Sequence, residues 1–152
     1  MIKSIFLMIS LLFAGLLSHA TLPPCLDKSG SHIPINNEEI INWKKTTQPQ
    51  FKDRGHAKGT LLKVYNDKTD HDHFQIQIGP ESNDVVEIIY NAEFGTLPEL
   101  KSNMQIEVCG DYITTKKSGY GASPDGAIIH WVHMSNSGNH PSGYVTIDGI
   151  VY

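Results

Sequence analysis

Residues 85–112 read VVEIIYNAEFGTLPELKSNMQIEVCGDY, and their pattern constrains the fold of the whole chain. Two β-rich runs, residues 85–90 and 104–112, flank a segment that does not have a strand pattern. In the second run Met104, Ile106 and Val108 alternate with other residues, so they face one side of a strand. The segment between the runs contains residues 97–102, which predict a helical turn or a short connector.

Three further strands and a hairpin are expected around this segment. Phe74, Ile76 and Ile78 alternate with glutamines, which places the three apolar side chains on one face of a strand. Asp148-Gly149 is a typical type I′ turn pair and predicts a hairpin. The remaining strands are expected at residues 59–65, 74–78 and 127–134, and the terminal hairpin at residues 144–152.

A short helix precedes the strands in this interpretation. Asn36 or Asn37 caps it, and Pro49 stops it at about Thr47. Five strands with a short connector between the third and the fourth favour an all-β fold, a small five-stranded OB-fold-like barrel with one N-terminal helix and a C-terminal hairpin. Another small β-barrel or a β-sandwich is the alternative.

The N-terminus has the pattern of a secretory signal peptide. Lys3 is followed by an apolar run at residues 5–17, and Ser18-His19-Ala20 places small residues where a signal peptidase cuts. Residues 1–20 are therefore expected to be removed, leaving an irregular segment at residues 21–35 and a single domain at residues 36–152. We expect an exported protein, periplasmic or extracellular, with no membrane span after cleavage. An uncleaved membrane anchor is the alternative.

Cysteine content predicts a disulfide, and the charge of the chain argues against one class of partner. Cys25 and Cys109 are the only cysteines, and export to an oxidising compartment predicts a disulfide between them; two free thiols are the alternative. The chain has a net charge of −4 and a single arginine, Arg54. A surface that follows a phosphate backbone needs many cations, so nucleic acid is not expected as the partner.

The C-terminal part carries a recurrent motif. Gly126-Ala-Ile-Ile-His-Trp-Val-His133, followed by His140-Pro-Ser-Gly-Tyr144, resembles the G-x-I-H-W-x-H … H-P-x-G-[WY] pattern of small exported bacterial proteins, domain-of-unknown-function family 3465. The resemblance covers residues 57–152 and implies a compact β domain outside the cytoplasm, with no assigned activity. Asp70 stands where the family has an arginine before the histidine matched by His71, which argues against anion binding in that loop.

Histidines are the main candidates for chemistry. His71 and His73 share one face of an extended chain, while His130 and His133 can meet only if their strand bulges or ends between them. A turn at residues 135–139 can bring His140 back toward His133. A transition-metal site, such as zinc, at these five histidines is one hypothesis. Structural roles, with each imidazole bonded to the backbone or exposed in a turn, are the alternative.

Three classes of function remain open. The first is a binding module for a small molecule, a glycan or a peptide, using the loops at residues 66–72 and 114–126. The second is a metal-dependent hydrolase or nuclease, although Glu87 and Glu107 are expected to be single solvated positions. The third is a structural or partner-binding envelope protein. The ligand-binding candidates are Lys116, Lys117, Tyr120 and Trp131.

Overall fold

The computed structural model describes residues 22–66, 70–119, 122–138 and 140–152. The expected leader, residues 1–20, and Tyr120 lie outside the described residues. Among the described residues, no helix has the length and apolar character that crossing a membrane requires. The elements, in chain order, are α1 (Asn37–Thr46), β1 (Lys52–Tyr65), β2 (His71–Gln77), β3 (Val85–Asn91), a 3₁₀ turn η1 (Ala92–Phe94), β4 (Gln105–Thr114), β5 (Ala127–His130), β6 (Tyr144–Ile147) and β7 (Ile150–Val151).

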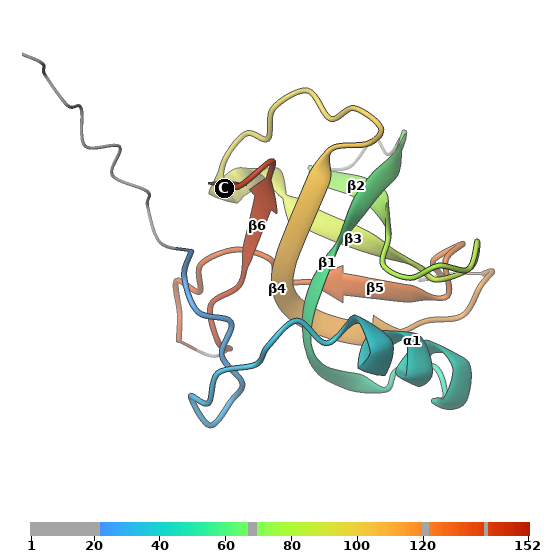
Figure 1. Cartoon of the computed structure of the whole chain (residues 1–152). Coiled ribbons are helices and arrows are strands. Elements are labelled where there is room, and N and C mark those ends of the chain that lie inside the picture. The colour runs from blue at the N-terminus through green and yellow to red at the C-terminus, as the bar shows by residue number, and fades with distance from the viewer. Residues whose placement is uncertain (1–21, 67–69, 120–121, 139) are drawn as a thin grey trace, which may run out of the picture.

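Five strands close into a barrel, as the sequence predicts. The strand order is β1-β2-β3-β5-β4, and β4 pairs again with β1. The β3–β5 pair is parallel and the other pairs around the barrel are antiparallel. Figure 1 shows β1 and β4 crossing in front of β2, β3 and β5, with α1 below them. This order and closure are those of an OB-like barrel, so the predicted fold is confirmed.

The long strand β1 makes the closure possible because it pairs with two partners. Residues 52–60 pair with β4, and residues 60–65 pair with β2. The register with β2 shifts between Leu61 and Lys63, a bulge that lets the strand bend. At Gly59 a β-carbon would lie 2.0 Å from the carbonyl oxygen of Gln77, so only glycine fits where the two strands approach.

The barrel interior is filled by the side chains that the alternation predicts. Phe74, Ile76, Ile106 and Val108 are fully buried, and Ile40 of α1 packs on the same core. The interior is therefore a packed apolar core rather than a ligand cavity.

Some strand boundaries differ from the sequence prediction: β1 begins at Lys52 rather than at residue 59. Residues 97–102 form the short connector, one of the two expectations for them, and among the described residues after β3 the helical turn is η1. The fifth strand ends at His130 rather than at residue 134, because Trp131 adopts a left-handed backbone conformation with φ of 56°. The predicted type I′ hairpin is present, with φ of 49° at Asp148 and 85° at Gly149.

Candidate functional site

The segment after β5 begins with a strained residue. Trp131 has a φ of 56°, a conformation that bulky side chains rarely adopt, and its side chain is exposed. Such strain persists only where surrounding contacts impose it, and it is concentrated at functional sites. The left-handed turn also ends the alternation of the strand, so His130 and His133 can approach each other, as the sequence analysis required.

Aromatic rings gather around this turn, and we call them the histidine–aromatic cluster. Its members are His71, Phe94, His130, Trp131, His133 and His140. The Trp131 ring stacks on His130 with centroids 4.9 Å apart and lies 4.6 Å from His140. His133 stacks on Phe94 at 3.5 Å, and His71 lies 6.0 Å from His130. Four predicted histidines and Trp131 are thus brought together.

An apolar pocket adjoins the cluster. It has a volume of about 240 Å³, and we call it the aromatic pocket. Phe94, Met134 and Val151 stand exposed at the pocket, and His133 belongs to both the pocket and the cluster. The main lining residues are Tyr90, Phe94, His133, Met134, Tyr144 and Val151.

Burial lowers the pKa values of two imidazoles at this site, those of His130 and His133. Burial, with repulsion from His71 and His133, lowers the pKa of His130 to about 4. Burial also lowers the pKa of His133. The pKa values of Tyr90 and Tyr144 are raised, in both cases chiefly by burial. The pocket therefore presents uncharged groups to a ligand.

The structure does not assemble the five predicted histidines into a metal site. Within residues 22–66, 70–119, 122–138 and 140–152, no three His, Cys, Asp or Glu side chains are grouped to hold a metal ion. His73 instead donates from Nδ1 to Glu87 Oε1 at 2.7 Å, and its ring centroid is 6.3 Å from that of His71. Metal binding at these histidines therefore stays a prediction.

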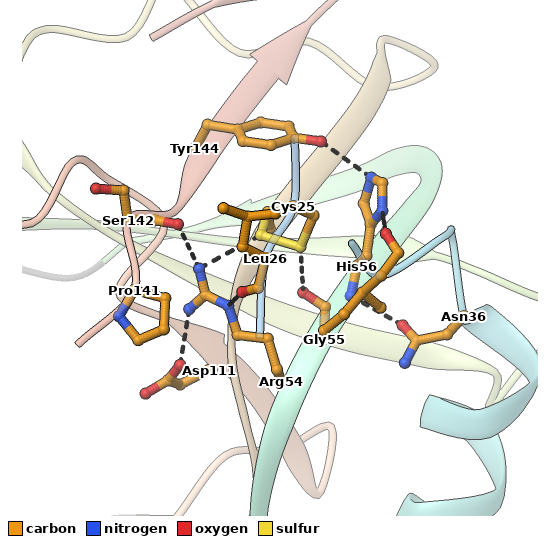
Figure 2. The surroundings of a disulfide bond; sticks show 12 residues. Cys25, Leu26, Asn36, Arg54, Gly55, His56, Asp111, Pro141, Ser142 and Tyr144 are labelled. Atoms are coloured by element: carbon orange, nitrogen blue, oxygen red, sulfur yellow. Dashed lines mark hydrogen bonds and ion pairs between the residues drawn. A yellow bond between two sulfur atoms is a disulfide. The ribbon is translucent and has the colours of Figure 1, made fainter. Parts of the chain in front are cut away.

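Arg54 bonds to Asp111, Leu26 and Ser142 (Figure 2), and Ser142 belongs to the loop after β5 that begins at Trp131. Arg54 Nη1 donates to Asp111 Oδ1 at 2.7 Å, and Asp111 pairs with His130 across β4 and β5. Its Nη2 donates to the carbonyl oxygen of Ser142. The amide of Gly143 donates to the carbonyl oxygen of His133 at 2.7 Å, and this bond joins the two ends of the loop that follows Trp131.

The predicted disulfide is present beside Arg54. Cys25 and Cys109 are bonded, with their Cα atoms 5.5 Å apart, and both are fully buried. The bond attaches the irregular N-terminal segment to β4, and Arg54 Nε donates to the carbonyl of Leu26 in that segment at 3.1 Å. Tyr144 packs against the disulfide and also lines the aromatic pocket.

The expectation that Glu87 and Glu107 are solvated is wrong. Both are more than nine-tenths buried. Glu107 Oε1 lies 3.1 Å from His56 Nε2 and accepts from the Tyr144 hydroxyl at 3.1 Å. Glu87 accepts from His73 and from the hydroxyl of Ser123. Period-two alternation places these carboxylates outside the barrel core, but it cannot show that neighbouring segments cover them.

The face of β2 and β3, where an OB barrel usually binds its ligand, is partly covered by the chain itself. Asp125, from the loop after β4, accepts from the hydroxyl of Tyr65 at 2.7 Å and from the amide of Gln75. Of the predicted ligand residues in this loop, Lys116 is exposed and Lys117 lines a pocket away from the cluster. Neither lysine lines the aromatic pocket.

The chain was compared with protein-family models and with curated proteins. No family model and no curated protein matches the chain. The resemblance of its C-terminal motif to domain-of-unknown-function family 3465 stays a prediction. Sequence analysis missed Phe94, Met134 and Val151, which have no sequence signal in common, and it also missed Arg54, which could have been singled out as the one arginine of the chain.

Proposed function

We propose that this protein is an exported binding module that holds a ring-sized apolar group in the aromatic pocket. One observation carries the proposal: exposed Phe94, Met134 and Val151 surround a pocket that adjoins the strained, exposed Trp131 through His133. Aromatic residues and methionine are enriched where proteins bind partners. Isolated exposed apolar residues need no explanation, but a group of them around a pocket marks a binding site.

The size and polarity of the pocket define the ligand class. Pockets for drug-sized ligands usually measure about 300–1,000 Å³. The aromatic pocket, at about 240 Å³, suits a single ring such as an indole or a phenol. His133 and the three tyrosines of the lining, Tyr90, Tyr144 and Tyr152, supply a few polar atoms without charge, so they favour a neutral aromatic compound over an ion or a sugar.

Export is the second part of the proposal. A buried disulfide supports an oxidising compartment, because such bonds rarely persist in the cytosol. The leader pattern at residues 1–20 and the motif resemblance to exported bacterial proteins agree with this compartment. A periplasmic or extracellular module that captures a small aromatic molecule follows from these features.

Tryptophan fluorescence provides the test. In a Trp43→Phe background, Trp131 is the single remaining tryptophan. The protein is titrated with indole analogues that do not fluoresce at the emission wavelength of tryptophan, and the change in Trp131 fluorescence reports binding in the adjoining pocket. We expect saturable binding that weakens at least about tenfold in Phe94→Ser. Val64→Ser is the matched control, because Val64 is similarly exposed but lies on β1, outside the pocket.

Two results would contradict the proposal. One is equal weakening in Phe94→Ser and Val64→Ser, which would indicate unspecific hydrophobic adsorption. The other is conversion of the compound, detected by chromatography after incubation, because a binding module releases its ligand unchanged and a hydrolase does not.

A further inference from the structure

A second pocket lies between the end of α1 and the loop after β4. It has a volume of about 320 Å³, and we call it the lysine pocket. Lys44 and Lys45 reach it from the last turn of α1, and Lys117 reaches it from the loop. Three ammonium groups around one pocket are notable in a chain whose net charge is −4.

The three lysines differ in how their charges are balanced. Lys45 Nζ lies 3.3 Å from Asp84 Oδ1, so this ammonium is paired with a carboxylate. Lys44 Nζ donates to the carbonyl oxygens of Asn83 at 2.6 Å and Val85 at 2.7 Å. Those bonds position the Lys44 ammonium and use two of its three N–H donors, but they bring no negative charge.

Lys117 adds a second positive charge to the same space. A β-carbon on Gly126 would lie 3.4 Å from both Cγ and Cε of Lys117, so the stem of this side chain follows the loop backbone. Burial lowers the pKa of Lys44, Asp125 opposes this effect, and Lys117 lowers that pKa further. The Asp125 carboxylate is itself bonded to Tyr65 and Gln75.

Hydroxyl groups complete the lining. Thr47 and Thr115 line the lysine pocket. The Thr47 hydroxyl already donates to the carbonyl oxygen of Trp43 at 2.7 Å, whereas the Thr115 hydroxyl, which accepts from the amide of Ser123, can donate its proton to an anion. The Lys44 and Lys117 ammonium groups and the Thr115 hydroxyl line one pocket, and this set matches the recognition of an oxyanion by charge-assisted hydrogen bonds. We propose that the lysine pocket binds a small oxyanion of the phosphate class, either the free ion or the end group of a phosphomonoester.

This inference does not depend on the proposed function. The lysine pocket and the aromatic pocket share no lining residue. Lys117 was expected from the sequence to bind a ligand. The structure places it at the same pocket as Lys44 of α1, a relationship that sequence patterns alone could not identify. Lys116, its neighbour in the chain, does not line the pocket.

Nuclear magnetic resonance tests the proposal directly. Inorganic phosphate and glycerol phosphate are titrated separately into the ¹⁵N-labelled protein at constant ionic strength, with the amides of Thr115 and Gly126 as reporters. We expect saturable shifts in the wild type and in Lys116→Gln, and binding at least about tenfold weaker in Lys117→Gln. Both lysines are exposed, so neither substitution should disturb the fold.

The two titrations identify the source of the oxyanion. Binding of phosphate alone assigns the free ion, and binding of both compounds with similar affinity assigns the phosphoryl end of a larger molecule. Shifts that do not saturate, or equal weakening in Lys116→Gln and Lys117→Gln, would overturn the proposal, because they would reflect only the general charge of the loop.

Discussion

Arg54 and Ser142 lie 88 positions apart in the chain, yet the Arg54 guanidinium donates a hydrogen bond to the Ser142 carbonyl oxygen. The same guanidinium donates to Asp111 on β4 and to the carbonyl of Leu26 near the disulfide. One buried side chain therefore connects the N-terminal segment, the barrel and the loop that carries Trp131. The shape of the candidate site depends on this connection.

Replacing Arg54 by methionine should destabilise the protein by about 2–4 kcal/mol, because Asp111 and two carbonyl groups lose their partner. Denaturant unfolding followed by circular dichroism measures the change. Lys52→Met on the same strand is the control, since Lys52 is exposed, and it should change stability by less than about 0.5 kcal/mol. Equal effects of the two substitutions would show that the Arg54 bonds are not stabilising.

Removing the disulfide should lower the free energy of unfolding by more than the Arg54 substitution does. The bond joins residues 84 positions apart, and the chain-entropy model gives about 4–5 kcal/mol for a loop of this length. The Cys25→Ser/Cys109→Ser variant should therefore unfold at a much lower temperature, as measured by differential scanning calorimetry. Dithiothreitol should lower the melting temperature of the wild type in the same direction and leave the double variant unchanged.

Stability should fall as the pH decreases from about 6.5 to about 4. His130 has a pKa of about 4 in the folded protein, whereas an unfolded histidine titrates near 6.5. The unfolded state therefore binds more protons in this window, and stability rises with pH across it. Discounted for solvent screening, the contribution is about 1–2 kcal/mol.

Urea unfolding at a series of pH values checks this prediction. The His130→Gln variant should show a smaller loss between pH 6.5 and pH 4 than the wild type. His32→Gln, at an exposed histidine, is the control and should keep the wild-type profile. A profile for His130→Gln that matches the wild type would assign the pH dependence to other groups.

The strain at Trp131 predicts an unusual order of two substitutions. At most positions glycine is less stable than alanine, but a left-handed conformation reverses the order by about 1–2 kcal/mol. Trp131→Gly should therefore be more stable than Trp131→Ala, although both lose the contacts with His130 and His140. Met134 does not have a positive φ, so Met134→Gly should be less stable than Met134→Ala.

Metal content separates the two hypotheses for the histidines. Far less than one transition-metal ion per chain in the mature, untagged protein would assign structural roles to these histidines, in agreement with the absence of three grouped ligands among the described residues. Elemental mass spectrometry measures the content beside a His130→Ala/His133→Ala variant. Nearly one zinc per chain, lost in the variant, would instead establish the metal site.

The barrel could be predicted because its core strands alternate with a period of two. Phe74 and Ile76 were placed correctly by that alternation. The start of β1 was placed seven residues too late, at residue 59 rather than Lys52. Residues such as Gly55 and His56 lack an obvious strand pattern, and they are extended because they pair with Gly110 and Cys109 of β4.

The candidate site was predictable only in part. The motif identified His130, Trp131, His133 and His140 from residue type and spacing, and the structure brings these rings together. The aromatic pocket beside them was not foreseen. Its lining comes from the N-terminal segment, β3, η1, the C-terminal loop and the terminal hairpin, so its composition depends on tertiary contacts that no local pattern encodes.

The bonds of Arg54 also set an order of assembly. Its partners Leu26 and Ser142 come from opposite ends of the domain, so their contacts close a long loop and form late in folding. The loop behind Trp131 can be fixed only after residue 142 has left the ribosome, and the adjacent Cys25–Cys109 bond needs an oxidant. Without that oxidant, the N-terminal segment would keep the hydrogen bond from Arg54 to Leu26 but not its covalent attachment to β4.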